Sequence, residues 1–87
     1  MIPLKKKLTY PIKSCFKDRE TLEKAIEGHH PQRDGTILLV GAADYRAFYS
    51  PKKDKIILTV YGKDKYELIE AEINFFEHIG FLYLKDK

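Results

Sequence analysis

The strongest pattern in the chain is a wide apolar helical repeat between residues 65 and 84. At about 100° per residue on a helix, its apolar positions cover an arc of roughly 220°, whereas a surface helix normally shows an arc somewhat wider than about 100°. These positions are Tyr66, Leu68, Ile69, Ala71, Ile73, Phe75, Phe76, Ile79, Leu82 and Tyr83. A small domain cannot cover so wide an arc with its own sheet, so the pattern predicts that part of this helix contacts a second chain.

Glu72 falls in the middle of the arc and divides it into two flanks. One flank holds Ile69, Ile73, Phe76 and Tyr83, and the other holds Leu68, Ala71, Phe75, Ile79 and Leu82. Burying an unpaired carboxylate costs several kcal/mol. We therefore expect Glu72 either to reach water between the flanks or to pair with a cation of a partner.

The first part of the chain predicts a strand and a short helix. Apolar residues recur at every second position within residues 8–16, which is typical of a half-buried strand. Pro11 has no backbone donor, so this strand should lie at a sheet edge or carry a bulge. Asp18 is a suitable N-cap for a helix with apolar positions at Leu22, Ala25 and Ile26.

Two further strands and the long helix follow. The β-branched and aliphatic run 36–40 predicts a strand that continues past Gly41 through residues 45–49 with a bulge. A turn at 50–54 leads to a third strand at 56–61. Asp64 and Glu67 have capping-box spacing and should open the long helix.

The predicted order is therefore β-α-β-β-α, which indicates an α+β fold: one antiparallel sheet with two helices packed on one face, in a single domain of residues 1–87. The end of the chain leaves two alternatives. Either Gly80 caps the helix and residues 81–84 form a fourth strand, or the helix continues, because Leu82 and Tyr83 stay in phase with the arc.

Composition narrows the class of protein. With 44% hydrophobic and 33% charged residues, the chain has the make-up of a folded domain. It has no apolar run near the roughly 20 residues that span a bilayer. Its single cysteine, Cys15, cannot form an internal disulfide, which fits a reducing compartment and a cytoplasmic location.

Three segments resemble a known family. Phe16 to Glu20 resemble a strand that ends in an aromatic residue before a capped helix, and residues 36–61 resemble a two-stranded hairpin. Residues 69–75 match a Leu-Arg-Ala-Ala-Val-Asn-Ser stretch at the apolar positions, at Ala71 and at Asn74. These features resemble the Pcc-type small subunit of the KEOPS complex, which makes threonylcarbamoyl-adenosine in transfer RNA. Glu70 and Phe75 replace the family's arginine and serine, so the chain is similar to a diverged paralogue.

The resemblance implies a non-catalytic docking subunit without a cofactor, whose helices bind a larger catalytic subunit or a related small chain as a homodimer or heterodimer. By analogy with the family segment, Ile69, Ile73 and Phe76 face inward. The expected partner-binding residues are Leu68, Glu70, Ala71, Glu72, Asn74, Phe75, Ile79 and Leu82. A Phe75→Asp change should then weaken association and leave the monomer folded.

A second hypothesis is an RNA-binding protein or a toxin-like ribonuclease that uses His29, His30, Arg33, Tyr45 and Arg46. Of these, His30, Arg33 and Arg46 are the expected RNA contacts, and the net charge of +3 supports only weak, salt-sensitive binding. Neighbouring histidines in a turn supply at most two of the three or four ligands that zinc needs, so we expect no metal site. A mobile-element inhibitor, which would also act by binding, is a third hypothesis.

Overall fold

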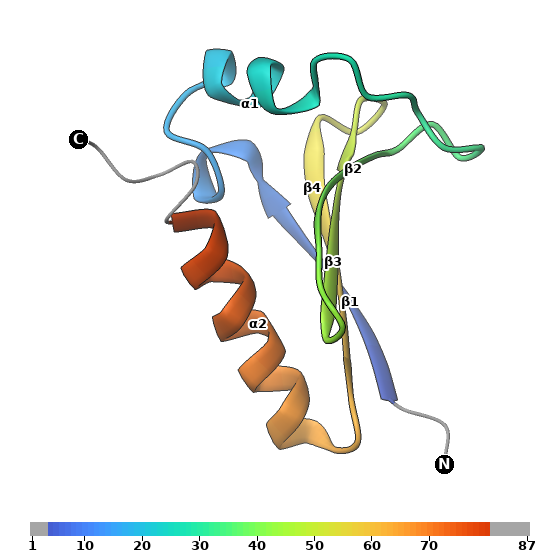
Figure 1. Ribbon diagram of the computed structural model, residues 1–87, viewed down its shortest axis with the longest axis vertical. Coiled ribbons are helices and arrows are strands. Elements are labelled where there is room, and N and C mark those ends of the chain that lie inside the picture. The colour runs from blue at the N-terminus through green and yellow to red at the C-terminus, as the bar shows by residue number, and fades with distance from the viewer. Residues whose placement is uncertain (1–3, 81–87) are drawn as a thin grey trace.

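A four-stranded antiparallel sheet with a long helix on one side organises the protein (Figure 1). The computed structural model describes residues 4–80. The elements are β1 (Leu4–Pro11), a 3-10 helix η1 (Ile12–Ser14), α1 (Arg19–Ile26), β2 (Ile37–Gly41), β3 (Tyr45–Ser50), β4 (Lys55–Gly62) and α2 (Lys65–Ile79). The strands lie in the order β1-β4-β3-β2. The predicted α+β class is confirmed.

The segment predicted as one long bulged strand is a hairpin of two strands. The chain reverses after Gly41, where the Ala42 N–H donates to the Tyr45 carbonyl at 2.8 Å. The bulge lies earlier, between Leu38 and Val40. The order of elements is therefore β-α-β-β-β-α with one 3-10 turn, and the hairpin implied by the family resemblance is a three-stranded meander here.

The first strand is shifted toward the N-terminus from its predicted range of 8–16. It begins at Leu4 and ends at Pro11, and the N–H groups of Cys15 and Phe16 then donate to the Ile12 carbonyl. Its position at the edge of the sheet agrees with the expectation from Pro11. Three consecutive lysines hid the start of the strand, because they mask the alternation of apolar and polar positions.

The two helices cover different parts of the sheet. Asp18 caps α1 as predicted, accepting from the Thr21 N–H at 2.8 Å. This helix lies across one end of the sheet beside β2, whereas α2 runs along the face (Figure 1). Gly80 has helical backbone angles after the last residue of α2. The alternatives proposed for residues 81–84 fall outside the described residues.

The core lies between α2 and one face of the sheet. Tyr45, Ala47 and Tyr49 on β3 pair with Val60, Leu58 and Ile56 on β4, and all six are buried. Side chains at the intervening positions, such as Arg46 and Phe48, lie on the other face, because successive side chains of a strand alternate. Among residues 4–80, Figure 1 shows no helix on that second side.

Candidate functional site

The turn before α2 fixes where this helix begins. A Cβ on Gly62 would lie 2.6 Å from the Cβ of Glu67, so only glycine permits this close approach. Asp64 accepts from the Glu67 N–H at 2.9 Å, and the Glu67 carboxylate accepts from the Lys63 N–H at 2.8 Å. The predicted pairing of Asp64 with the start of the helix is confirmed, and it sets which α2 side chains face the sheet.

The buried line of α2 consists of Ala71, Phe75 and Ile79, each 0% exposed. The Phe75 ring lies between two sheet tyrosines, with its centroid 6.5 Å from that of Tyr10 and 5.9 Å from that of Tyr45. It also meets the Phe76 ring edge-on at 5.0 Å. Phe75 is thus at the centre of the helix–sheet contact.

The predicted assignment of the two flanks is wrong apart from Phe76, which packs against the core as expected. Phe75, Ala71 and Ile79 were expected to bind a partner, but they are buried inside the monomer, and Leu68 beside them is half-buried. Ile69 and Ile73 were expected to face the sheet but point outward. The reason is tertiary: Tyr10 and Tyr45 leave room for one aromatic ring between them, and Phe75 occupies it. Leu82, also expected to bind a partner, falls outside the described residues.

Glu72 has a partner within the protein. Its carboxylate accepts a hydrogen bond from the Tyr10 hydroxyl, so neither a partner's cation nor exposure to water is needed to explain it. Burial, together with this hydrogen bond to Glu72, raises the pKa of the Tyr10 hydroxyl well above its ordinary value. The hydroxyl therefore stays protonated and continues to donate at neutral pH.

The outward side of α2 carries an apolar stripe. Within the described residues five large hydrophobic side chains are exposed, and three of them share this helix: Tyr66 at 71%, Ile69 at 58% and Ile73 at 51%. At about 100° per residue they fall within roughly 60° of one another. We call Tyr66, Ile69 and Ile73 the α2 stripe. Tyr66 was missing from the predicted contacts, although its place in the arc was a signal for it.

A groove of about 480 Å³ lies beside the stripe, between α2 and the edge strand β1. Its apolar lining comes from Leu4, Leu8, Val60, Leu68 and Ile69, and its charged lining comes from Lys5, Lys6, Lys65 and Glu72. The stripe and the groove therefore form one continuous apolar surface through Ile69.

The remaining predicted contacts on α2 are polar. Glu70 is exposed on the helix surface. Asn74 donates to the Asp44 carboxylate at 3.0 Å, which ties α2 to the β2–β3 turn. The structure thus gives Asn74 a role within the monomer.

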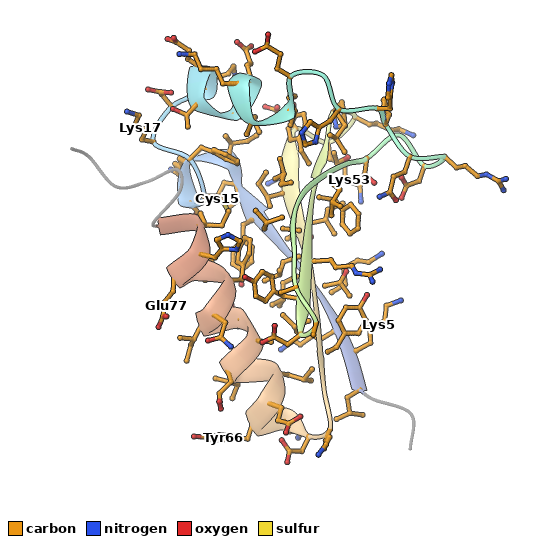
Figure 2. The ribbon with its side chains drawn as sticks, viewed as in Figure 1. Lys5, Cys15, Lys17, Lys53, Tyr66 and Glu77 are labelled. Carbon is orange, nitrogen blue, oxygen red and sulfur yellow. The ribbon has the colours of Figure 1, made fainter. Side chains whose placement is uncertain are left out.

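The sheet face opposite α2 combines cations with rings. Lys5 and Lys7 of β1 and Arg46 of β3 are exposed, and Tyr61 of β4 and Phe48 of β3 are half-buried. We call these five residues the open face. Figure 2 shows Lys5 on the side of the sheet away from α2, while Tyr66 and Glu77 lie on the helix side. Lys5, Lys7 and Tyr61 were not predicted as contacts. Their signal was alternation, because Lys5 and Lys7 are two residues apart and Tyr61 is two residues from Thr59, which lies on the same face.

The three predicted RNA contacts come from two segments at opposite ends of β2. Arg46 pairs with Gly41, the last residue of β2, whereas His30 and Arg33 lie in the loop before its first residue, Ile37. At about 3.3 Å per residue, the strand alone separates these positions by about 13 Å. Tyr45, which the ribonuclease hypothesis also uses, is buried, and its hydroxyl lies 2.8 Å from Nδ1 of His78.

Other candidate chemistry is limited in residues 4–80. No group of three His, Cys, Asp or Glu side chains there could hold a metal ion. Cys15 is 0% exposed, and burial raises the pKa of its thiol from 9.0 to about 12, so this cysteine is not an activated nucleophile. No helix in the same range is long and apolar enough to cross a membrane.

Comparison with known proteins adds no relative: no family model, no curated protein and no solved structure matches the chain. The candidate surfaces therefore follow from the residues and their arrangement alone.

Proposed function

We propose that this protein is a non-catalytic docking subunit that binds another protein through the α2 stripe. The observation that carries the proposal is the exposure of Tyr66, Ile69 and Ile73 on one side of a helix whose other side is fully packed. The wide apolar arc predicted from the sequence is thus divided between the protein's own core and an uncovered surface.

The energy available at this surface suits a complex. Complete burial of an isoleucine side chain stabilises by about 1.5–3 kcal/mol, so covering the exposed halves of Ile69 and Ile73 contributes about 1–2 kcal/mol each. Tyr66 adds a large side chain with a hydroxyl, a type enriched at interface cores. Association costs subtract from this gain, so we expect the adjacent groove, with Leu4 and Leu8, to contribute as well.

The partner in this proposal is a larger catalytic subunit or a related small chain, as the resemblance to the KEOPS small subunit suggests. Support of transfer RNA modification and a cytoplasmic location belong to the same proposal. The contact residues differ from those first expected: Tyr66, Ile69 and Ile73 replace Ala71, Phe75 and Ile79, because the latter are buried in the monomer. A mobile-element inhibitor would use the same surface.

The experiment compares Ile69→Glu with Leu38→Glu. Leu38 is exposed to 41% on β2 and away from the stripe, so it is a matched control for placing a charge on an exposed apolar residue. Mass by light scattering reports self-association of the pure chain, and quantitative co-purification from the native host reports other partners. We expect Ile69→Glu to weaken the complex about 5- to 30-fold or more and Leu38→Glu to leave it intact. Equal association of both variants and the parent would refute the proposal.

A further inference from the structure

The open face carries positive charge that the protein leaves unpaired. Lys5, Lys7 and Arg46 take part in no ion pair within residues 4–80. The carboxylate lining the shallow pocket of about 210 Å³ on this face is Asp34. It already accepts from the backbone N–H and the hydroxyl of Thr36, at 3.0 and 2.7 Å. Arg46 shares a second hollow with Lys63 and with the carboxylates of Asp44 and Glu67, so the excess of positive charge on this face lies at Lys5 and Lys7.

The strand register places Lys7 and Arg46 between two aromatic rings and Lys5 beside the first of these rings. Lys5 is opposite Tyr61 on β4, and in the next row of the same face Lys7, Thr59 and Arg46 lie side by side. One row further on, Phe48 is opposite Ile57. Along the two central strands the order is thus ring, cation row, ring. Thr59 is 5% exposed, so the neighbouring side chains cover the sheet between the rings.

This alternation fits a nucleic acid strand with unpaired bases. Bases stack on aromatic side chains without regard to sequence, while cations in a groove follow the phosphates. A duplex keeps its bases stacked inside, so rings lying half-buried on a flat sheet could not reach their faces. An acidic peptide would pair with the cations but would leave the rings unused.

We propose that the open face binds single-stranded nucleic acid, with bases stacked on Tyr61 and Phe48 and phosphates held by Lys5, Lys7 and Arg46. The open face and the α2 stripe lie on opposite sides of the molecule (Figure 2). Lys5 also lines the groove beside the stripe, so a protein partner that fills the groove would compete for Lys5 but would leave Lys7, Arg46 and both rings free. The inference does not depend on the docking function.

The test is fluorescence anisotropy of the full chain with labelled single-stranded oligouridylate and oligothymidylate, and with a duplex of equal length. Three phosphate contacts predict that log K falls with log salt at a slope of about −2 for a single strand. Arg46→Gln should reduce the magnitude of this slope by about 0.7. Lys17→Gln is the matched control, because it removes the same charge from an exposed residue beside α1, away from the open face (Figure 2).

The rings are tested separately from the charges. Loss of one base–aromatic stack should weaken binding about 5- to 100-fold, and Tyr61→Leu should do so without changing the salt slope. Because Tyr61 is half-buried, circular dichroism checks that this variant is folded, and Phe48→Leu provides a second ring variant. The proposal is supported whether oligouridylate or oligothymidylate binds more tightly, because the expected contacts are to bases and phosphates, which both have.

Four results would overturn the inference. They are the absence of single-strand binding at low salt, tighter binding of the duplex, an equal effect of Lys17→Gln and Arg46→Gln, and full affinity in folded ring variants. If polyglutamate bound equally well and ring variants changed nothing, the face would be a site for acidic peptides instead.

Discussion

Substitution of the adjacent α2 residues Phe75 and Ile73 tests which flank of the helix belongs to the core. Phe75 is 0% exposed and touches the rings of Tyr10, Tyr45 and Phe76, whereas Ile73 is 51% exposed. Truncating a fully buried phenylalanine to alanine costs about 3–5 kcal/mol. For Ile73→Ala we expect about 1 kcal/mol, because only half of a side chain worth about 1.5–3 kcal/mol is buried.

These magnitudes are large relative to the stability of the domain. At about 0.05–0.15 kcal/mol per residue, the chain should have a free energy of unfolding on the order of 4–13 kcal/mol. Phe75→Ala should therefore remove a large fraction of it. Phe75→Asp also buries a carboxylate, which costs several kcal/mol more, so it should prevent folding, in contrast to the expectation from sequence.

Urea denaturation followed by circular dichroism measures both variants, at a protein concentration low enough that association does not contribute. We expect the midpoint to fall much further for Phe75→Ala than for Ile73→Ala, with similar slopes against urea. Equal losses, or a larger loss for Ile73→Ala, would refute the assignment of the buried flank and with it the α2 stripe.

Two further predictions concern the cap of α2 and the buried thiol. Asp64→Ala removes the N-cap and should lower the free energy of unfolding by about 0.5–2 kcal/mol. Hydrogen exchange in the first turn of α2 should become faster. Asp64→Ser, which keeps a capping oxygen, should retain most of the stability, and equal losses in the two variants would contradict the capping role. Burial raises the pKa of the Cys15 thiol from 9.0 to about 12, so folding favours the protonated thiol. The contribution of this thiol to the free energy of unfolding is therefore complete below pH 9 and is lost as the pH rises toward 12. Between pH 9 and 10 the loss of stability approaches about 1.4 kcal/mol per pH unit. Cys15→Ala should remove this pH dependence, as measured by urea denaturation at several pH values. If stability fell with pH just as steeply in that variant, the thiol would not be the cause.

The amino-acid sequence by itself determined the local features of the fold. Asp18 and Asp64 marked the starts of the helices because a capping side chain acts on backbone groups within three residues. Alternation along residues 45–49 puts Tyr45 and Tyr49 on one face and Arg46 and Phe48 on the other, because successive strand side chains point to opposite faces; the structure shows that the tyrosine face is the buried one. These interactions involve neighbours in the chain, so a pattern of residue types is sufficient to reveal them.

The hairpin at residues 41–45 was missed because its turn, Ala42 to Asp44, lacks the Asn-Gly or Asp-Gly pair that marks most tight hairpins. Gly41 was interpreted as a bulge, since nothing local distinguishes a bulge from the end of a strand. Pairing of Val40 with Ala47 decides it, and that pairing depends on the rest of the sheet.

Periodicity fixed the width of the apolar arc on α2 but not its rotation about the helix axis. Either flank of the arc could have faced the sheet, because the angles between positions are the same in both cases. The rings of Tyr10 and Tyr45, far apart in sequence, make the space that Phe75 fills, and the Tyr10 hydroxyl satisfies Glu72 beside it. Only the tertiary structure decided that Ile69 and Ile73 face outward, since the shape of the opposing sheet chooses the flank that packs best.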